Sequence, residues 1–151
     1  MSLPDPLLRY SVDAKPVHDL LRRALIQLAG FQLKRLVADR PGLCSYEPVE
    51  AARSALSEAA ECLRSLGSPS GAVHHRSHLQ AAAAALQRAV AAALSRHDRD
   101  GSDLFRHLED AERQMRSVSR ALPGFGPVDF GQACCAAHMR LPDASALQCS
   151  G

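Results

Sequence analysis

The stretch that decides the fold is LFRHLEDAERQMRSVSRAL, residues 104–122. Its apolar residues recur at alternating intervals of four and three, which is the repeat of one face of an α-helix. Charged and polar residues fill the other positions, so the opposite face suits water. Ser102 can cap this helix, and Asp103 suits the positive end of its dipole. The apolar face consists of Leu104, Leu108, Ala111, Met115, Val118 and Leu122.

Three earlier segments show the same helical repeat and predict three more amphipathic helices. Pro16 is well placed in the first turn of the first helix, and Ser45 can cap the second. Four such helices joined by short loops are typical of an antiparallel up-and-down four-helix bundle, which makes the expected fold class all-α. The earlier helices are predicted at residues 17–38, 45–66 and 72–97, and the loops at 39–43, 67–71 and 97–102.

The two ends of the chain lack this regular pattern. Residues 1–15 contain Pro4 and Pro6 and are predicted to be an extended lead-in. Residues 123–151 follow the last helix, and we expect a short C-terminal helix or an ordered tail there. No segment has the composition of a linker, so residues 1–151 are predicted to form one helical-bundle domain.

The amino-acid composition and the net charge limit the kinds of partner that the chain is expected to bind. Aromatic residues make up only 4% of the chain and Trp is absent, so Ala and Leu must supply most of the core. The formal net charge is +2, and the basic residues form no stripe of the kind that binds nucleic acid. The apolar run at residues 81–94 contains Gln87 and Arg88 and is too short to cross a bilayer. The first residues, MSLPDPLLRY, do not have the pattern of a signal peptide, so the predicted location is the cytoplasm. Five cysteines is an odd number, and a reducing compartment would keep them as thiols.

The first helix carries a second apolar line, opposite its main core face. Ile26, Leu33 and Val37 lie on this line with Gly30 between them. A second apolar line predicts a second packing partner, because a simple bundle helix needs only one buried face. We expect that partner to be either the C-terminal tail or a second copy of the chain. The remaining alternative is that the three apolar side chains face water.

Histidine and cysteine pairs suggest a different hypothesis, a metal or thiol site. Cys134 and His138 are four residues apart, with Cys135 beside them, and a helix would place the first two on one face. His74 and His78 have the same spacing. If the two sets met, they could hold zinc, copper or nickel, or support thiol chemistry. The alternative is that the cysteines are buried apolar residues and the histidines lie on the surface.

One short stretch resembles a phosphotransfer helix. VHHRSHLQ, residues 73–80, resembles the phospho-acceptor helix of one class of sensor histidine kinases, in which the pattern is approximately H-H-R-x-x-N-x-L-Q. His75 and Arg76 match its H-R step, whereas the Asn is absent and no ATP-binding domain follows. The resemblance covers about eight residues, and it implies a histidine phosphotransfer module centred on His75.

The chain contains no nucleophile elbow, phosphate-binding glycine loop or H-E-x-x-H pattern. The favoured interpretation is therefore a small cytoplasmic protein that is not an enzyme. We expect it to act through helix-face contacts with itself or with a partner protein, without nucleic acid, membrane or cofactor.

Overall fold

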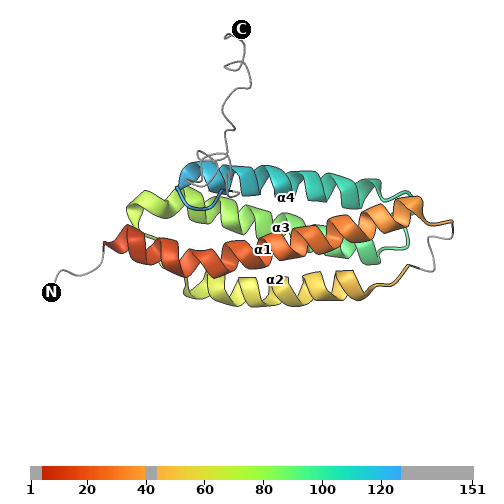
Figure 1. Cartoon of the computed structure of the whole chain (residues 1–151), viewed down its shortest axis with the longest axis horizontal. Coiled ribbons are helices and arrows are strands. Elements are labelled where there is room, and N and C mark those ends of the chain that lie inside the picture. The colour runs from red at the N-terminus through yellow and green to blue at the C-terminus, as the bar shows by residue number, and fades with distance from the viewer. Residues whose placement is uncertain (1–4, 40–43, 127–151) are drawn as a thin grey trace, which may run out of the picture.

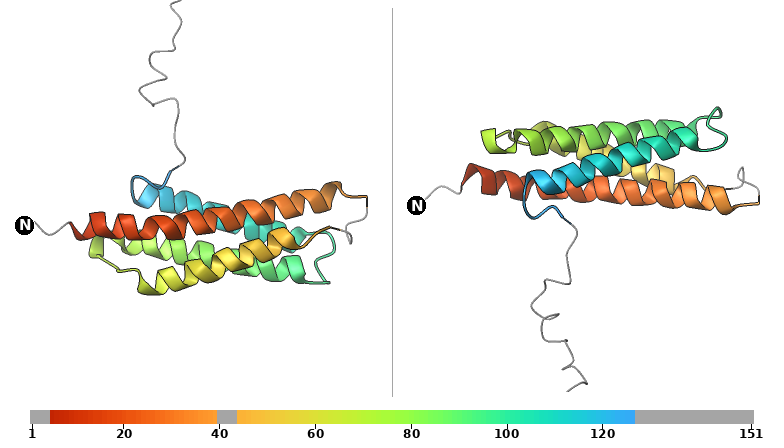
Figure 2. Two further views of the ribbon diagram at one scale, coloured as in Figure 1. Left: turned by 60° about the horizontal axis from the view of Figure 1, so that its bottom comes forward. Right: turned by 90° about the horizontal axis from the view of Figure 1, so that it is seen from above.

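The computed structural model describes residues 5–39 and 44–126, and the regular secondary structure in that part is entirely helical. The four long helices lie side by side (Figure 1), so the expected all-α class is confirmed. Within the group, α3 packs most closely on α4, and α1 packs most closely on α2 (Figure 2). The elements are α1 (Pro6–Val37), α2 (Glu47–Ser65), the short 3-10 turn η2 (Ser70–Ala72), α3 (Val73–Leu94) and α4 (Ser102–Ala121).

Helix α1 begins eleven residues earlier than the sequence pattern predicts. The predicted extended lead-in over residues 1–15 is wrong from Pro6 onward. Asp5 caps the helix, because its carboxylate accepts a hydrogen bond from the Leu7 amide at 3.0 Å. Pro6 occupies the first turn, where a missing amide proton costs nothing.

Pro16 therefore lies inside α1 and not at its start. An internal proline removes one helical hydrogen bond and typically costs about 3 kcal/mol. The helix tolerates it because the residues on either side are held by burial. Tyr10, Ala14 and Val17 are all buried and extend the core face at the helical repeat. Pro16 is therefore not the start of the helix, and the first-turn proline of α1 is Pro6.

Asp98, and not Ser102, caps helix α4. Ser102 is the first helical residue, and Gly101 precedes it with a left-handed backbone φ of 73°. The two carboxylate oxygens of Asp98 accept hydrogen bonds from the amides of Asp103 and Leu104, at 3.1 and 3.0 Å. The Asp98 side chain is buried, so this cap also holds the loop against the bundle.

The α3–α4 loop is attached to α1 by two more contacts. The side-chain amide of Gln32 donates a hydrogen bond to the Gly101 carbonyl at 3.2 Å. The Arg35 guanidinium donates one to the Asp98 carbonyl. A Cβ atom at Gly101 would clash with the side-chain amide of Gln32, which would have to move, and the left-handed φ of Gly101 also favours glycine.

The other helix ends differ from prediction by a few residues. Helix α2 begins at Glu47, whose amide donates to the Ser45 hydroxyl at 3.2 Å, although Tyr46 occupies the cap position. Helix α3 ends at Leu94 and not at residue 97. Ser95 accepts a hydrogen bond from the His97 amide in the turn that follows.

The predicted apolar face of residues 104–122 is confirmed, because all six of its residues are buried. At the end of α3, Leu94 is exposed, and Leu25 of α1 is only partly buried. Alanines of α3 fill much of the contact with its neighbours, which allows close helix packing. None of the described helices is long and apolar enough to cross a membrane. The largest fully buried apolar side chains are Phe31, Leu21, Leu28, Leu79, Leu86, Leu104, Val17, Val49 and Val118.

Candidate functional site

Helix α1 carries an exposed apolar line on the side opposite its buried face. Ile26, Leu33 and Val37 are 59%, 63% and 74% exposed. A Cβ atom added to Gly30 would meet nothing within 4 Å. We call Ile26, Gly30, Leu33 and Val37 the outer line. No described residue covers it, and whether the tail or a second copy does so stays a prediction.

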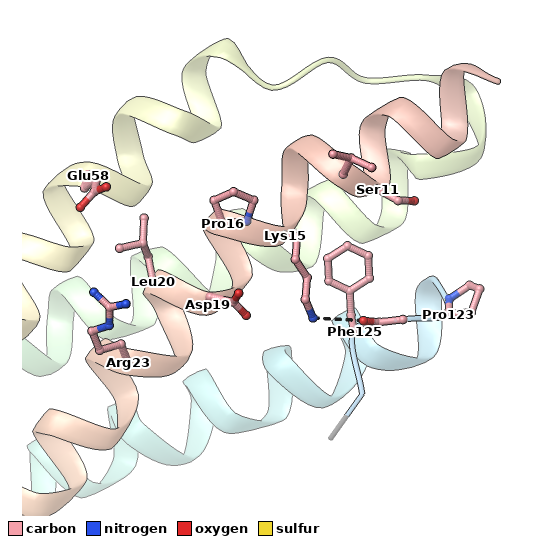
Figure 3. A pocket seen from close by; sticks show the side chains of 11 residues that line it. Ser11, Lys15, Pro16, Asp19, Leu20, Arg23, Glu58, Pro123 and Phe125 are labelled. Atoms are coloured by element: carbon pink, nitrogen blue, oxygen red, sulfur yellow. Dashed lines mark hydrogen bonds between the residues drawn. The ribbon is translucent and has the colours of Figure 1, made fainter. Parts of the chain in front are cut away.

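The repeat of the outer line continues toward the start of α1 and becomes one side of a groove (Figure 3). The groove has a volume of about 710 Å³, and Glu58 of α2 and the turn after α4 complete its lining. Lys15 Nζ donates a hydrogen bond to the Gly124 carbonyl at 3.1 Å and lies 5.4 Å from the centre of the Phe125 ring. The residues of α1 that continue the repeat into this groove are Val12, Pro16, Asp19 and Arg23.

A second groove, of about 480 Å³, runs between α1 and α4. Leu36 and Phe105 line it from the two helices, and both side chains are more than half exposed. Leu33 also lines it and therefore belongs to this groove as well as to the outer line. We call the outer line together with Leu36 and Phe105 the outer surface. It offers a partner a long apolar strip with a recess at its side.

A buried aromatic cluster lies where the chain leaves α4. The Tyr10 hydroxyl and Nδ1 of His75 are 2.8 Å apart and share a hydrogen bond. The Phe125 ring lies 4.2 Å from the His75 ring and 5.5 Å from the His18 ring, measured between centroids. Phe125 is 2% exposed and so closes this cluster from water. The cluster thereby fixes the turn after α4 on α1 and α3.

Burial shifts the titration of this cluster. Burial, together with smaller effects of the nearby His18 and His78, lowers the pKa of His75 to about 4. Burial likewise lowers the pKa of His18, against a hydrogen bond from its ring to Asp19 that raises it. The pKa of Tyr10 is raised to about 12 by burial. The cluster is therefore neutral at physiological pH, and His75 Nε2 is buried without a hydrogen-bond partner among the described residues.

The position of His75 bears on the phosphotransfer hypothesis. A phospho-acceptor nitrogen must be reached by its phosphoryl donor, whereas the His75 ring is 1% exposed and covered by Phe125. This ring instead packs in the core, as expected for a residue four positions before Leu79. We therefore do not propose phosphotransfer for this chain.

The candidate metal ligands are only partly within the described structure. His74 is exposed, and His78 is half-buried with Nδ1 2.8 Å from the Gln114 side-chain oxygen. Within residues 5–39 and 44–126, no three His, Cys, Asp or Glu side chains are placed to hold a metal ion. The other predicted ligands, Cys134, Cys135 and His138, lie outside the described residues, so the combined site stays a prediction.

The aromatic cluster was not predicted from the sequence. Tyr10 fell in the supposed lead-in, and its partner His75 is 65 positions away. One signal was available, since Tyr10 and Ala14 continue the core repeat of α1 backward from Val17 and Leu21. Pro16 lies between these two parts of the repeat and resembles a helix start, which hides the continuation.

Comparison with known proteins found no family model, no curated protein and no solved structure that matches this chain.

Proposed function

We propose that this chain is a small, cytoplasmic, non-catalytic protein that acts through contacts between the outer surface and another protein chain. That chain is a second copy or a partner protein. In this proposal the four helices form an antiparallel up-and-down bundle, and the bundle is the rigid support of the surface. The observation that carries the proposal is the outer line, where three large apolar side chains are each more than half exposed.

Contact between water and an apolar surface of this extent is unfavourable in free energy. Burying apolar area contributes about 25 cal/mol for each Å², so a partner that covers the strip gains stability from it. Single exposed apolar residues are common, but contiguous patches usually mark interaction sites. Gly30 also favours association, because the absence of a side chain there allows the backbone of another segment to approach α1 closely.

The grooves beside the outer surface suit binding better than catalysis. A hydroxyl nucleophile needs a base within hydrogen-bond reach. Ser11, the hydroxyl in the lining of the larger groove, instead donates its proton to the Leu7 carbonyl at 2.9 Å. The His75 ring is 1% exposed and lies against Phe125, so it does not face the groove. The groove lining is otherwise apolar or charged, which supports recognition by contact.

The expected partner segment is an amphipathic helix. Such a helix places apolar side chains at intervals of three and four, and these match the spacing of the outer line. Charged residues lie next to the line on α1 and would form a polar rim. They are Arg22, Arg23 and Lys34. This rim is too small to favour nucleic acid or a membrane surface as the partner.

The test uses the double variant Ile26→Glu with Leu33→Glu. Sedimentation of the wild-type chain over a range of concentrations reports self-association, and affinity capture reports partner proteins. We expect the wild-type chain to associate in one of these ways and the double variant to lose that association while keeping its helicity by circular dichroism. The proposal is wrong if the wild-type chain stays monomeric and captures the same proteins as the double variant.

A further inference from the structure

We infer that residues 127–140 of this chain lie along the outer line of α1, so that the C-terminal segment is the first occupant of the outer surface. The inference rests on the proposed function because both concern the outer surface. It names the segment that covers this surface, and it implies that a partner protein must displace that segment.

The first argument is the place where the described chain ends. Phe125 is buried against His18 and His75, and Lys15 holds the Gly124 carbonyl. The turn after α4 is thus fixed at two points on α1 and α3. Gly124 and Phe125 also line the larger groove, and Figure 3 shows Phe125 beside Lys15 of α1. The described chain therefore ends next to the groove formed by the early part of α1.

The second argument is the register of α1. Ile26 and Leu33 follow Lys15 by 11 and 18 residues, which are close to three and five whole helical turns. All three residues therefore lie on the same side of the helix. At 1.5 Å per residue, Ile26 is about 17 Å and Leu33 about 27 Å along the axis from Lys15. The turn after α4 therefore contacts α1, through Lys15, on the same side of the helix as the exposed apolar residues.

The third argument is length. Residues 127–140 would span about 21 Å as a helix and up to about 46 Å if extended. Either conformation reaches Ile26, and an extended one reaches beyond Leu33. No stretching of the chain is required.

The fourth argument is the composition of the segment. Its larger apolar and small residues fall at intervals of three and four, so one face of a helix there would be apolar. These residues are Phe130, Ala133, Cys134 and Ala137. Phe130 supplies the large apolar side chain of this face, and the small residues suit a close approach to α1 between Ile26 and Gly30, where α1 has open space.

The segment also has an advantage over a second copy of the chain. A segment tied to its site by a short linker has an effective concentration in the millimolar range. A second chain at about ten micromolar would need roughly 100-fold higher affinity to compete, since occupancy depends on the ratio of concentration to dissociation constant. The tethered segment therefore occupies the surface first at ordinary protein concentrations.

The test is disulfide cross-linking in the full chain. In the variant Ile26→Cys, the new thiol lies on the outer line, and Cys134 and Cys135 are native thiols of the segment. A disulfide needs the two Cα atoms within about 7 Å, so its formation reports proximity. The matched control is Ala91→Cys, an exposed position in the separate groove between α2 and α3. Mild oxidation, a non-reducing gel and peptide mass mapping identify the linked pairs.

We expect an intrachain disulfide between position 26 and Cys134 or Cys135, at several times the yield given by Ala91→Cys. Adding Phe130→Asp to the Ile26→Cys variant should reduce this yield to the control level. Interchain disulfides through position 26 would overturn the inference in favour of a second copy. A yield at position 26 no higher than at position 91 would also overturn it. Leu33→Cys serves as a second probe if Ile26→Cys lowers helicity.

The cross-link and the association measurements fail independently. An intrachain cross-link without any change in sedimentation or capture by the double glutamate variant would keep the inference and reject the proposed function. Association that depends on Ile26 and Leu33, without a cross-link above control, would keep the proposed function and reject the inference.

Discussion

The Tyr10 hydroxyl lies 2.8 Å from Nδ1 of His75, and this hydrogen bond joins the first turns of α1 to the start of α3. The rings meet edge to face, with centroids 5.5 Å apart. Phe125 covers the pair from the other side. Three segments that are distant in the sequence are therefore joined at one buried histidine, and its protonation should affect all of them.

The first prediction is that the chain loses stability as the pH falls below about 6.5. The pKa of His75 is about 4 in the folded chain and near 6.5 when the chain is unfolded, so between these values the unfolded chain binds a proton that the folded chain does not. The stabilisation is complete above pH 6.5 and is lost progressively toward pH 4. At pH 5, His75 should lower the free energy of unfolding by about 1–2 kcal/mol relative to pH 7.

Urea unfolding at a series of pH values, followed by circular dichroism, measures this loss. His18 also has a lowered pKa and adds to it in the same direction, and Lys15 and Arg76 are cationic neighbours. The control is His75→Gln, which keeps a partner for Tyr10 but does not titrate. Its pH dependence should be clearly shallower, and an equal slope in the two chains would contradict the assignment to His75.

The second prediction concerns the core. Leu86→Ala and Leu108→Ala should each lower the free energy of unfolding by about 2–5 kcal/mol, because both side chains are buried between helices. Leu94→Ala is the matched control, since that leucine is 46% exposed, and it should cost less than about 1 kcal/mol. Chemical denaturation measures all three. Losses below about 0.5 kcal/mol at both buried sites would show that the core face is misplaced.

The third prediction concerns Gly101. Gly101→Ala should destabilise the chain by at least about 1–2 kcal/mol, because alanine disfavours a left-handed φ and its Cβ would meet the Gln32 side chain. Gly67→Ala is the control, because an added Cβ there meets nothing within 4 Å and its φ is not left-handed. That change should stay within about 0.5 kcal/mol. Thermal denaturation of the two variants measures the difference. Equal melting temperatures would show that position 101 does not require glycine.

The fourth prediction concerns the cap of α4. Asp98→Ala removes the acceptors for two amides and should cost about 1–2 kcal/mol. Asp98→Asn keeps one of the two side-chain acceptors and should cost less. Ser102→Ala should have little effect, because Ser102 is already inside the helix. A larger loss for Ser102→Ala than for Asp98→Ala, measured by urea unfolding, would restore serine as the cap.

The fifth prediction concerns the thiols that lie outside the described residues. If Cys134 and Cys135 pack against the bundle, at least one should react slowly with a thiol reagent near neutral pH, because apolar burial raises a thiol pKa. A chelator should not change the rate. Elemental analysis of protein purified without a histidine tag provides the control for metal. Labelling that begins only after chelation would favour a metal site with His138 and contradict the packing role.

The helices and their inner faces were predictable because the apolar residues that become buried recur with the helical period, as they do along residues 104–122. The start of α1 was missed because two prolines outweighed a repeat that runs back through Ala14 to Tyr10. The cap at Asp98 was missed because a side chain can reach amides several residues ahead, while the sequence rule favours the nearest Ser or Thr. These errors are local, and the packing of the helices overrides each local preference.

Only part of the candidate site was predictable from the sequence. The outer line followed from the period alone, because Ile26, Leu33 and Val37 lie opposite the core face. The groove beside it was not predictable, since one wall comes from the turn at Gly124, more than 100 positions from Lys15. The His75 cluster was hidden for the same reason. Periodicity identifies faces within a helix, whereas contacts between distant segments need the folded chain.

The internal Pro16 has a consequence for local unfolding. Because proline has no amide proton, the Val12 carbonyl has no donor four residues ahead, and the hydrogen-bond ladder of α1 is interrupted. Residues 6–15 can therefore open as a separate unit, at a lower free energy than global unfolding. Opening would break the bond between Tyr10 and His75 while the rest of α1 stays helical. Hydrogen–deuterium exchange should accordingly be faster in the amides before Pro16 than in those of residues 20–32.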